Sequence, residues 1–442
     1  MSTRLVNFPF KPAKIPFFYG WVIVAVCAFG VVMSVPGQTI GFSVFTEPLR
    51  EAVGLSRKDL SKAYLVGTLL SSFMLPFAGK MIDKLGGRIM GTISAVMLGL
   101  ACLLMSQIDR FAEFAGQFGL AFAAVCLCFT FMRFSGQGCM TMSSRVTMAR
   151  WFEHRRGLTA ALSGIVVSFG FNASPKPLGL MVGNIGWSST YIVLSVAVGI
   201  GMSIIAFVLF RDNPEECGMH VDGPNYLKAR EKSGEVADEY FDFNRSQAVK
   251  TPEFWIYTFA VALSALLTTS ISFHTEAIGL EAGLTAQQAF GLYMPMSFFS
   301  AFSNLIGGYF SDKVKMQKIL FIFMVAITFA IIGTANWDKL YGRLMFMAGF
   351  GTSGGLFNTL RTVAWARFFG RKHLGAINGL TMSILVISTA AGPWLFSLLK
   401  EFLGTYSNVL LSFAVFPVII FIFAFFTGNP QERYAEKAKT SV

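Results

Sequence analysis

The stretch GKMIDKLGGR, residues 79–88, separates two long apolar runs and has the pattern Gly-x-x-x-Asp-Lys-x-Gly-x-Arg. Its first part recurs as GYFSDK at residues 308–313, again directly after an apolar run. When residues 43–84 are aligned with residues 272–313 without a gap, eleven of the 42 pairs are identical, whereas average composition predicts roughly three. The chain therefore contains two homologous halves.

Apolar runs cover most of the chain. The sequence is 54% hydrophobic and only 14% charged over 442 residues, which is typical of a membrane protein. Runs of about 20 apolar residues can cross ~30 Å of hydrocarbon as helices, and long unbroken runs favour helices over the alternating strands of a barrel. We predict an all-α polytopic membrane protein with twelve transmembrane helices. The predicted spans are residues 18–43, 60–79, 89–107, 118–142, 158–182, 190–210, 254–273, 289–310, 319–335, 343–365, 376–399 and 407–427.

The distribution of positive charge predicts the orientation. With the N-terminus inside, the inner segments hold 24 Lys and Arg residues and the outer loops hold six. This bias predicts a multi-pass protein of the cell inner (cytoplasmic) membrane with both termini cytoplasmic, so the net charge of +12 gives no support to nucleic-acid binding. The predicted division is an N-terminal six-helix bundle (1–210), a cytoplasmic linker (211–252) and a C-terminal bundle with a short tail (253–442).

The motif at residues 79–88 resembles the signature of the major facilitator superfamily, and GYFSDK resembles its weaker second copy. FYGWVIV, RFSGQG, WFEHRRGLTAALSG, RDNPEECG and TPEFW resemble the bacterial monocarboxylate-transporter-like and oxalate/formate-antiporter-like branches. The resemblance implies two pseudo-symmetric six-helix bundles and transport by alternating access, with a site at their interface near the midplane.

Asp83 and Asp312 are placed by the two motif copies at the cytoplasmic end of a span. A carboxylate there can accept hydrogen bonds from a neighbouring helix N-terminus and pair with Lys or Arg. The resemblance implies a conformational latch, whereas spacing alone also fits a tight, charged turn. The latch candidates are Gly79, Asp83, Lys84, Arg88, Gly308, Asp312 and Lys313.

Six basic residues belong neither to the inner segments nor to the outer loops: Lys62, Arg133, Arg145, Lys176, Arg343 and Arg361. Lys62 and Arg343 lie near span ends, where they can reach water. The acidic residues all fall in loops, in the linker or at span ends. Since a cation in hydrocarbon costs at least about 2.5–3.5 kcal/mol, we interpret the missing counter-ion as a small organic anion, expected to be a carboxylate bound by Arg133, Arg361 or both.

Polar residues on the predicted spans extend this site, although each of them alone could serve helix packing. Arg145 and Arg361 could instead reach the cytoplasmic face. The oxalate/formate-like branch carries basic residues in its eighth and eleventh helices, which are absent from spans 289–310 and 376–399 here. We therefore expect residues of the fourth, fifth and tenth spans to determine which substrate binds. The substrate-binding candidates are Arg133, Arg361, Lys176, Asn172, Gln137, Tyr64, Tyr293, Asn304 and Asn358.

Coupling to protons needs a group that gains and loses a proton, and His274 with Glu276 is the candidate pair. Exchange of one anion for another would need no such group. A proton-coupled exporter of drug-like compounds is the alternative function, because RFSGQG also resembles an antiporter motif. The sequence shows no nucleophile with a base, no metal cluster and no nucleotide loop, so we expect a monomeric carrier in the lipid bilayer with no enzymatic activity and no cofactor.

Overall fold

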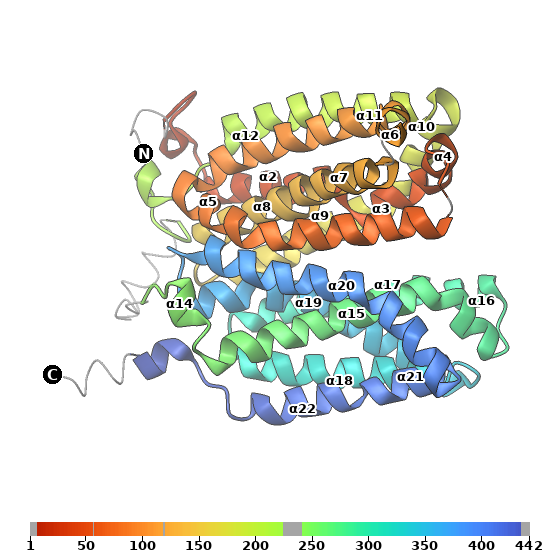
Figure 1. Ribbon diagram of the computed structural model, residues 1–442. Coiled ribbons are helices and arrows are strands. Elements are labelled where there is room, and N and C mark those ends of the chain that lie inside the picture. Colours follow the sequence, from red (N-terminus) through yellow and green to blue (C-terminus); the bar gives the residue numbers. More distant parts are fainter. Residues whose placement is uncertain (1–6, 56, 118–119, 224–240, 435–442) are drawn as a thin grey trace. The chain divides into compact units, whose positions relative to one another are not determined.

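The computed structural model describes residues 7–55, 57–117, 120–223 and 241–434. For residues 43, 47, 57, 58, 61, 172, 175, 176, 276, 286, 287 and 290 it describes the backbone alone. Within these residues the chain is built from helices and contains no strand. It divides into two compact units (Figure 1). Unit 1 comprises Met1–Glu153, Ser163–Asp238 and Lys372–Ser383, and unit 2 comprises His154–Leu162, Glu239–Arg371 and Ile384–Val442.

Each predicted span contains helix, and several spans are interrupted. The helices of the first half of the chain are α2 (Gly20–Met33), α3 (Thr39–Phe42), α4 (Thr46–Ala52), α5 (Arg57–Met105), α6 (Ile108–Gly116), α7 (Ala121–Arg133), α8 (Thr141–Trp151), α9 (Arg156–Ala173), α10 (Pro175–Ile185), α11 (Trp187–Val196) and α12 (Ser203–Leu209), of which α4 and α6 lie between predicted spans. The π-helical segments η4 (Phe134–Met140) and η5 (Ala197–Met202) join α7 to α8 and α11 to α12.

The second half of the chain has longer, less broken helices. They are α14 (Arg245–Ala248), α15 (Pro252–Glu281), α16 (Ala286–Gly291), α17 (Tyr293–Ser311), α18 (Met316–Ala335), α19 (Leu340–Phe369), α20 (Leu374–Leu403), α21 (Tyr406–Phe413) and α22 (Val415–Ala424). In unit 2, α19 packs against α15, α17 and α18, and α18 packs against α22. In unit 1, α5 packs against α7 and α12, and α2 packs against α8.

The second and third predicted spans are two helices that meet at a sharp bend at Gly86, where the backbone is not helical, and the label α5 covers both. Gly86 has φ +83°, a conformation that costs glycine little because it has no Cβ. The motif GKMIDKLGGR therefore spans the bend itself: Asp83 lies before it and Arg88 lies after it.

Seven helical segments within the described residues are long and apolar enough to cross a membrane. The segment at Trp187–Leu209 has the highest mean hydropathy, 2.7, and only 17% of its most apolar window is buried inside the protein. Large side chains such as Phe298 and Phe426 are more than two-thirds exposed, at 72% and 76%. Apolar surface of this extent requires lipid as its solvent, so the chain is an all-α polytopic membrane protein, which is consistent with the predicted twelve transmembrane helices.

Candidate functional site

Arg133 lies deep in the fourth span, at the junction of α7 and the π-helical segment η4. Its side chain is buried, with 4% of its surface exposed. Short π-helical segments inside α-helices are frequent at functional sites because they interrupt the regular hydrogen-bond ladder. The π-helical segment η4 therefore begins directly after Arg133, the more deeply buried of the two predicted substrate-binding arginines.

The guanidinium group of Arg133 has neutral neighbours. Its Nη1 donates a hydrogen bond of 3.0 Å to the carbonyl oxygen of Gly37 and lies 3.5 Å from Oγ1 of Thr39. Its Cζ atom lies 5.1 Å from the ring centroid of Tyr64, within cation–π range. Nε is buried without a hydrogen-bond partner, and no carboxylate among the described side chains pairs with this arginine. Among the described groups, the charge is therefore stabilised by the carbonyl of Gly37, the hydroxyl of Thr39 and the ring of Tyr64.

The carbonyl of Gly37 is available because the first span breaks there. After α2 ends, residues Val35–Gly37 form one turn of 3-10 helix, and Pro36 has no N–H to continue an α-helix. Gly37 also permits a close approach: a Cβ at this position would lie 2.7 Å from the carbonyl oxygen of Met132 and 2.8 Å from Cα of Gly136. The break and the glycine contact together bring a backbone acceptor to Arg133.

A polar network surrounds this break. Gln38 donates to the hydroxyl of Ser34 at 2.9 Å, and Thr141 donates to the same hydroxyl at 3.2 Å. The Tyr64 hydroxyl donates to Thr39 at 2.9 Å. Oε1 of Gln137, on η4, is buried without a partner. Of the predicted substrate-binding residues, Arg133, Tyr64 and Gln137 thus belong to one region of unit 1.

Other predicted substrate-binding residues belong to unit 2. Tyr293 shares a hydrogen bond of 2.7 Å with the hydroxyl of Thr275, and Asn304 donates to the carbonyl of Ala161 at 3.3 Å while its Oδ1 is buried without a partner. Asn358 and Arg361 are half-buried on α19. The Arg361 guanidinium lies 6.0 Å from the ring of Phe357. The side chains of Lys176, Asn172 and Glu276 lie outside the described residues.

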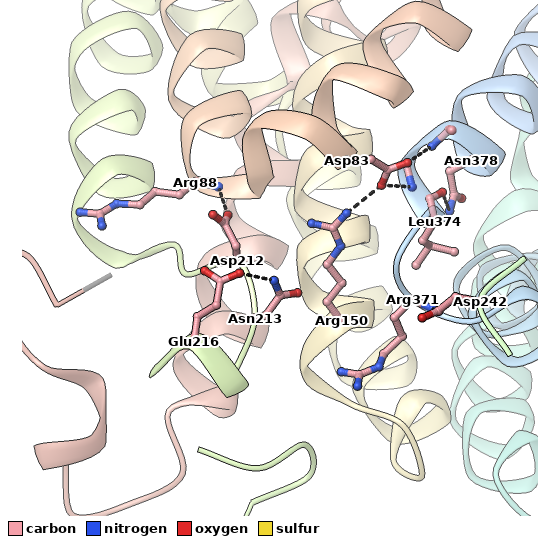
Figure 2. Close-up of polar contacts among 12 residues, drawn as sticks. Asp83, Arg88, Arg150, Asp212, Asn213, Glu216, Asp242, Arg371, Leu374 and Asn378 are labelled. Atoms are coloured by element: carbon pink, nitrogen blue, oxygen red, sulfur yellow. Dashed lines mark hydrogen bonds and ion pairs between the residues drawn. The ribbon is translucent and has the colours of Figure 1, made fainter. Parts of the chain in front are cut away.

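The first latch candidate, Asp83, binds the beginning of α20 (Figure 2). The backbone N–H groups of Gly375 and Ala376 donate to its two carboxylate oxygens at 2.8 and 2.7 Å, and Arg150 donates at 2.7 Å. These two N–H groups belong to the first turn of a helix, where they have no partner within the helix. The carboxylate therefore receives charge-assisted bonds from a helix N-terminus and an arginine at once.

The glycines of the motif explain how the carboxylate reaches that turn. A Cβ at Gly375 would lie 2.5 Å from the carbonyl oxygen of Gly79, and a Cβ at Gly79 would collide with the carbonyl of Gly375. The backbones of α5 and α20 can therefore touch only while both positions lack a side chain. Gly79 sets the distance at which Asp83, one turn later, meets the N–H groups.

The second motif copy repeats this arrangement in unit 2. The carboxylate of Asp312 accepts hydrogen bonds from the N–H groups of Gly157, at 2.7 Å, and Leu158, at 3.2 Å, in the first turn of α9. A Cβ at Gly308 would lie 2.5 Å from the carbonyl oxygen of Gly157. The duplicated Gly-x-x-x-Asp pattern thus corresponds to a duplicated contact between a helix end and a helix beginning.

The remaining latch candidates have other contacts. Arg88 is buried, and its side chain donates to the carbonyls of Phe207 at 2.6 Å and Phe8 at 2.7 Å. Lys84 is exposed, and the exposed Lys313 donates to the hydroxyl of Tyr309. In these contacts Arg88 ties the start of the third span to the end of the sixth and to the N-terminal segment.

Asp212 is a residue of this region that sequence reasoning did not single out. Its carboxylate accepts the backbone N–H of Arg88 at 2.8 Å (Figure 2). The carboxylate also lies against Gly86, where an added Cβ would collide with it. Burial raises the pKa of the Asp212 carboxyl above its ordinary value, while the hydrogen bond from Arg88 opposes this rise. The signal in the sequence was the position of Asp212 in RDNPEECG, directly after the sixth span.

His274, the predicted coupling residue, is buried near the end of α15. Its ring nitrogens lie 3.0 Å from the carbonyl oxygen of Pro393 and 3.0 Å from the hydroxyl of Tyr406. Both contacts are with residues far away in the sequence, on α20 and α21.

Comparison with known proteins identifies the family. A sequence model described as Major Facilitator Superfamily matches residues 21–361. The chain is 23% identical over 413 residues to the multidrug resistance protein MdtL of Salmonella dublin, covering 93% of this chain and 96% of the relative. It is 22% identical over 353 residues to the oxalate:formate antiporter of Oxalobacter formigenes, covering 77% of each.

Solved structures share the fold at lower identity. The chain is similar to the proton:xylose symporter XylE bound to 6-bromo-6-deoxy-D-glucose, with a TM-score of 0.67 and 13% identity over 92% of this chain and 95% of that chain. It is also similar to the human organic anion transporter MFSD10, with a TM-score of 0.64 and 12% identity over 92% of this chain and 99% of that chain. At these identities the likeness concerns the fold.

Proposed function

The chain belongs to the major facilitator superfamily, and we propose that it carries a small organic anion with a carboxylate group across the membrane by alternating access. The family and fold are those of secondary transporters rather than of enzymes. The proposal concerns the chemical class of the substrate, and the observation that supports it is the environment of Arg133.

Arg133 is a buried cation whose described neighbours are a carbonyl, two hydroxyl-bearing side chains and no carboxylate. A buried ion without a counter-ion carries a desolvation cost of several kcal/mol, on the order expected for any ion removed from water. A carboxylate from outside would offset this cost and would satisfy the free Nε donor. Guanidinium is suited to this role because its planar donors match the two oxygens of a carboxylate.

Residues other than Arg133 also have roles in the proposed transport. Gln137 and Tyr64 supply polar groups beside Arg133, and Arg361 is a second candidate cation in unit 2. Asp83 and Asp312 serve as latches, since their bonds to the first turns of α20 and α9 must break when those helices move. Transport occurs by proton symport or by anion exchange.

The relative named as an oxalate:formate antiporter supports an anionic substrate. The relative named as a multidrug resistance protein, which matches more of the chain at similar identity, supports a second candidate function, proton-coupled export of drug-like compounds. Arg133 favours the first function over export of a lipophilic cation, because a buried guanidinium repels a cation.

Uptake by proteoliposomes tests the proposal. The purified protein is reconstituted and offered labelled mono- and dicarboxylates with and without a pH gradient. We expect saturable uptake of at least one carboxylate, reduced roughly 10-fold or more by Arg133→Ala, since hydrogen bonds to a charged group contribute about 1.5–3 kcal/mol. Arg110→Ala removes an exposed arginine and is the matched control. Unchanged uptake in Arg133→Ala removes Arg133 from the site, whereas transport of a lipophilic cation and of no carboxylate favours the exporter.

A further inference from the structure

His274 is held between three helices of unit 2. It lies on α15 and is 8% exposed. Nε2 lies 3.0 Å from the carbonyl oxygen of Pro393 on α20 and 3.4 Å from the hydroxyl of Ser397 on the same helix. Nδ1 lies 3.0 Å from the hydroxyl of Tyr406 on α21. The two ring nitrogens therefore face different helices and different chemical groups.

These partners define which nitrogen carries the hydrogen. A carbonyl oxygen only accepts hydrogen bonds, so the short contact with Pro393 requires a hydrogen on Nε2 of His274. In the neutral ring, Nδ1 then holds a lone pair and accepts the hydrogen of the Tyr406 hydroxyl. The position at which this histidine can take up a proton is thus Nδ1, the atom that faces Tyr406.

Tyr406 also connects His274 to an ion pair. Lys400 Nζ lies 3.1 Å from Oε1 of Glu281, and Oε2 of Glu281 accepts the backbone N–H of Tyr406 at 2.8 Å. Lys400 Nζ lies 4.3 Å from the centroid of the Tyr406 ring. The titratable or charged groups near His274 within the described residues are therefore Tyr406 from α21, Lys400 from α20 and Glu281 from α15 itself.

We propose that Nδ1 of His274 is the proton-binding site through which transport is coupled to a proton gradient; this rests on the proposed carrier function. A proton from water binds the Nδ1 lone pair and gives an imidazolium. Nδ1–H then points at the Tyr406 oxygen, so the hydroxyl hydrogen of Tyr406 must rotate to another acceptor. The charge of the imidazolium is added near that of Lys400, so protonation disfavours the packing of α15, α20 and α21 that the structure shows.

The element that would respond is α20. Pro393 lies inside this helix, where it lacks an N–H and interrupts the backbone ladder, and its carbonyl is the acceptor for His274. An interrupted helix bends at lower cost than a regular one. Protonation leaves the Nε2–H bond to Pro393 in place, but it removes the bond from the Tyr406 hydroxyl and adds repulsion from Lys400, which lies on the part of α20 after Pro393. This repulsion acts across the point at which α20 is already weakened and supplies the differential stabilisation that a coupled conformational change needs.

Nitrogen NMR of the full-length protein tests the proton site without any substrate. The chain has four histidines, so a sample labelled with ¹⁵N-histidine in detergent gives few signals, and His274→Gln identifies that of His274. We expect an Nε2–H tautomer at high pH and conversion to imidazolium as the pH is lowered to about 5. Tyr406→Phe should shift this titration. An Nδ1–H tautomer, or a ring that stays neutral down to about pH 5, overturns the proposal.

Transport tests the coupling. In proteoliposomes with a carboxylate identified as above, we expect a pH gradient to stimulate uptake by the natural protein. His274→Gln keeps an N–H donor for Pro393 but cannot bind a proton, so its uptake should remain at the level without a gradient. His220→Gln, an exposed histidine, is the control. Full stimulation in His274→Gln overturns the proposal.

If His274→Gln does not fold, Tyr406→Phe decides, because it should move the pH midpoint of stimulation and an unmoved midpoint counts against coupling. If no carboxylate is carried, the proposed function fails while the NMR result still decides the proton site.

Discussion

Asp83→Asn is expected to reduce the transport rate roughly 100-fold or more, because breaking one partner of a buried ion pair costs about 3–5 kcal/mol. The side chains of Arg150 and Asp83 are 6% and 12% exposed, so water screens their 2.7 Å contact little. Asparagine keeps the shape of aspartate but loses the charge. Its NH₂ group also faces donors, namely Arg150 and the N–H groups of Gly375 and Ala376. The conformation with α5 against α20 should therefore become rare.

Uptake in proteoliposomes measures the rate, and spin labels measure the conformation. Labels at the exposed positions Lys84 and Lys372, in a variant without the six native cysteines, report the distance between α5 and the start of α20. We expect this distance to lengthen in Asp83→Asn. Lys80→Gln, an exposed change on the same helix, should leave both measurements unchanged. A normal rate with an unaltered distance distribution would show that Asp83 is not a latch.

The helical architecture could be predicted from the sequence because each span carries its own signal. A run of about 20 apolar residues must satisfy its backbone hydrogen bonds internally, whatever its neighbours are. The residues 79–88 and 308–313 likewise indicated in advance that a carboxylate lies at a helix end, since the pattern is local and occurs twice. The helix beginnings that receive it, at Gly375 and Gly157, could not be predicted from spacing because they are far away in the sequence.

Local irregularities were less predictable. The bend of α5 at Gly86 and the break of the first span at Val35–Gly37 involve glycine or proline, which are compatible with many backbone conformations inside a membrane helix. The π-helical segment after Arg133 carries no sequence signal that distinguishes it from an α-helix. Its presence beside Arg133 adds a structural reason to the prediction, made from charge alone, that this residue is functional.

Pairing between side chains was the least predictable feature. His274 was predicted to act with Glu276 because the two are close in sequence, and that pairing stays a prediction. The described contacts of the His274 ring are instead with Tyr406 and Pro393, more than 100 residues later. Similarly, the Asp212 contact with Arg88 joins residues that only the folding of unit 1 brings together. A single sequence holds no record of such tertiary contacts.

Gly157→Ala is expected to be as damaging as the loss of Asp83, although it adds only one methyl group. A Cβ at Gly157 would collide with the carbonyl oxygen of Gly308 and with the hydroxyl of Ser311, so α9 and α17 must separate. Overpacking costs about 1–3 kcal/mol. Separation also removes the bonds from Gly157 and Leu158 to Asp312, each contributing about 1.5–3 kcal/mol. The sum corresponds to a loss of transport of roughly 100-fold or more.

Gly183→Ala is the matched control, because an added Cβ there meets no atom within 4 Å. The decisive measurement is a double-mutant cycle of transport rates with Asp312→Asn. If the glycine matters because it lets Asp312 reach the first turn of α9, the two changes remove the same contact, and the double variant should be little worse than either single one. Additive losses would mean that Gly157 serves helix packing alone and that Asp312 acts elsewhere. Non-additive losses would instead support the view that Asp312, like Asp83, acts by binding the first turn of a helix, as the duplicated sequence predicts.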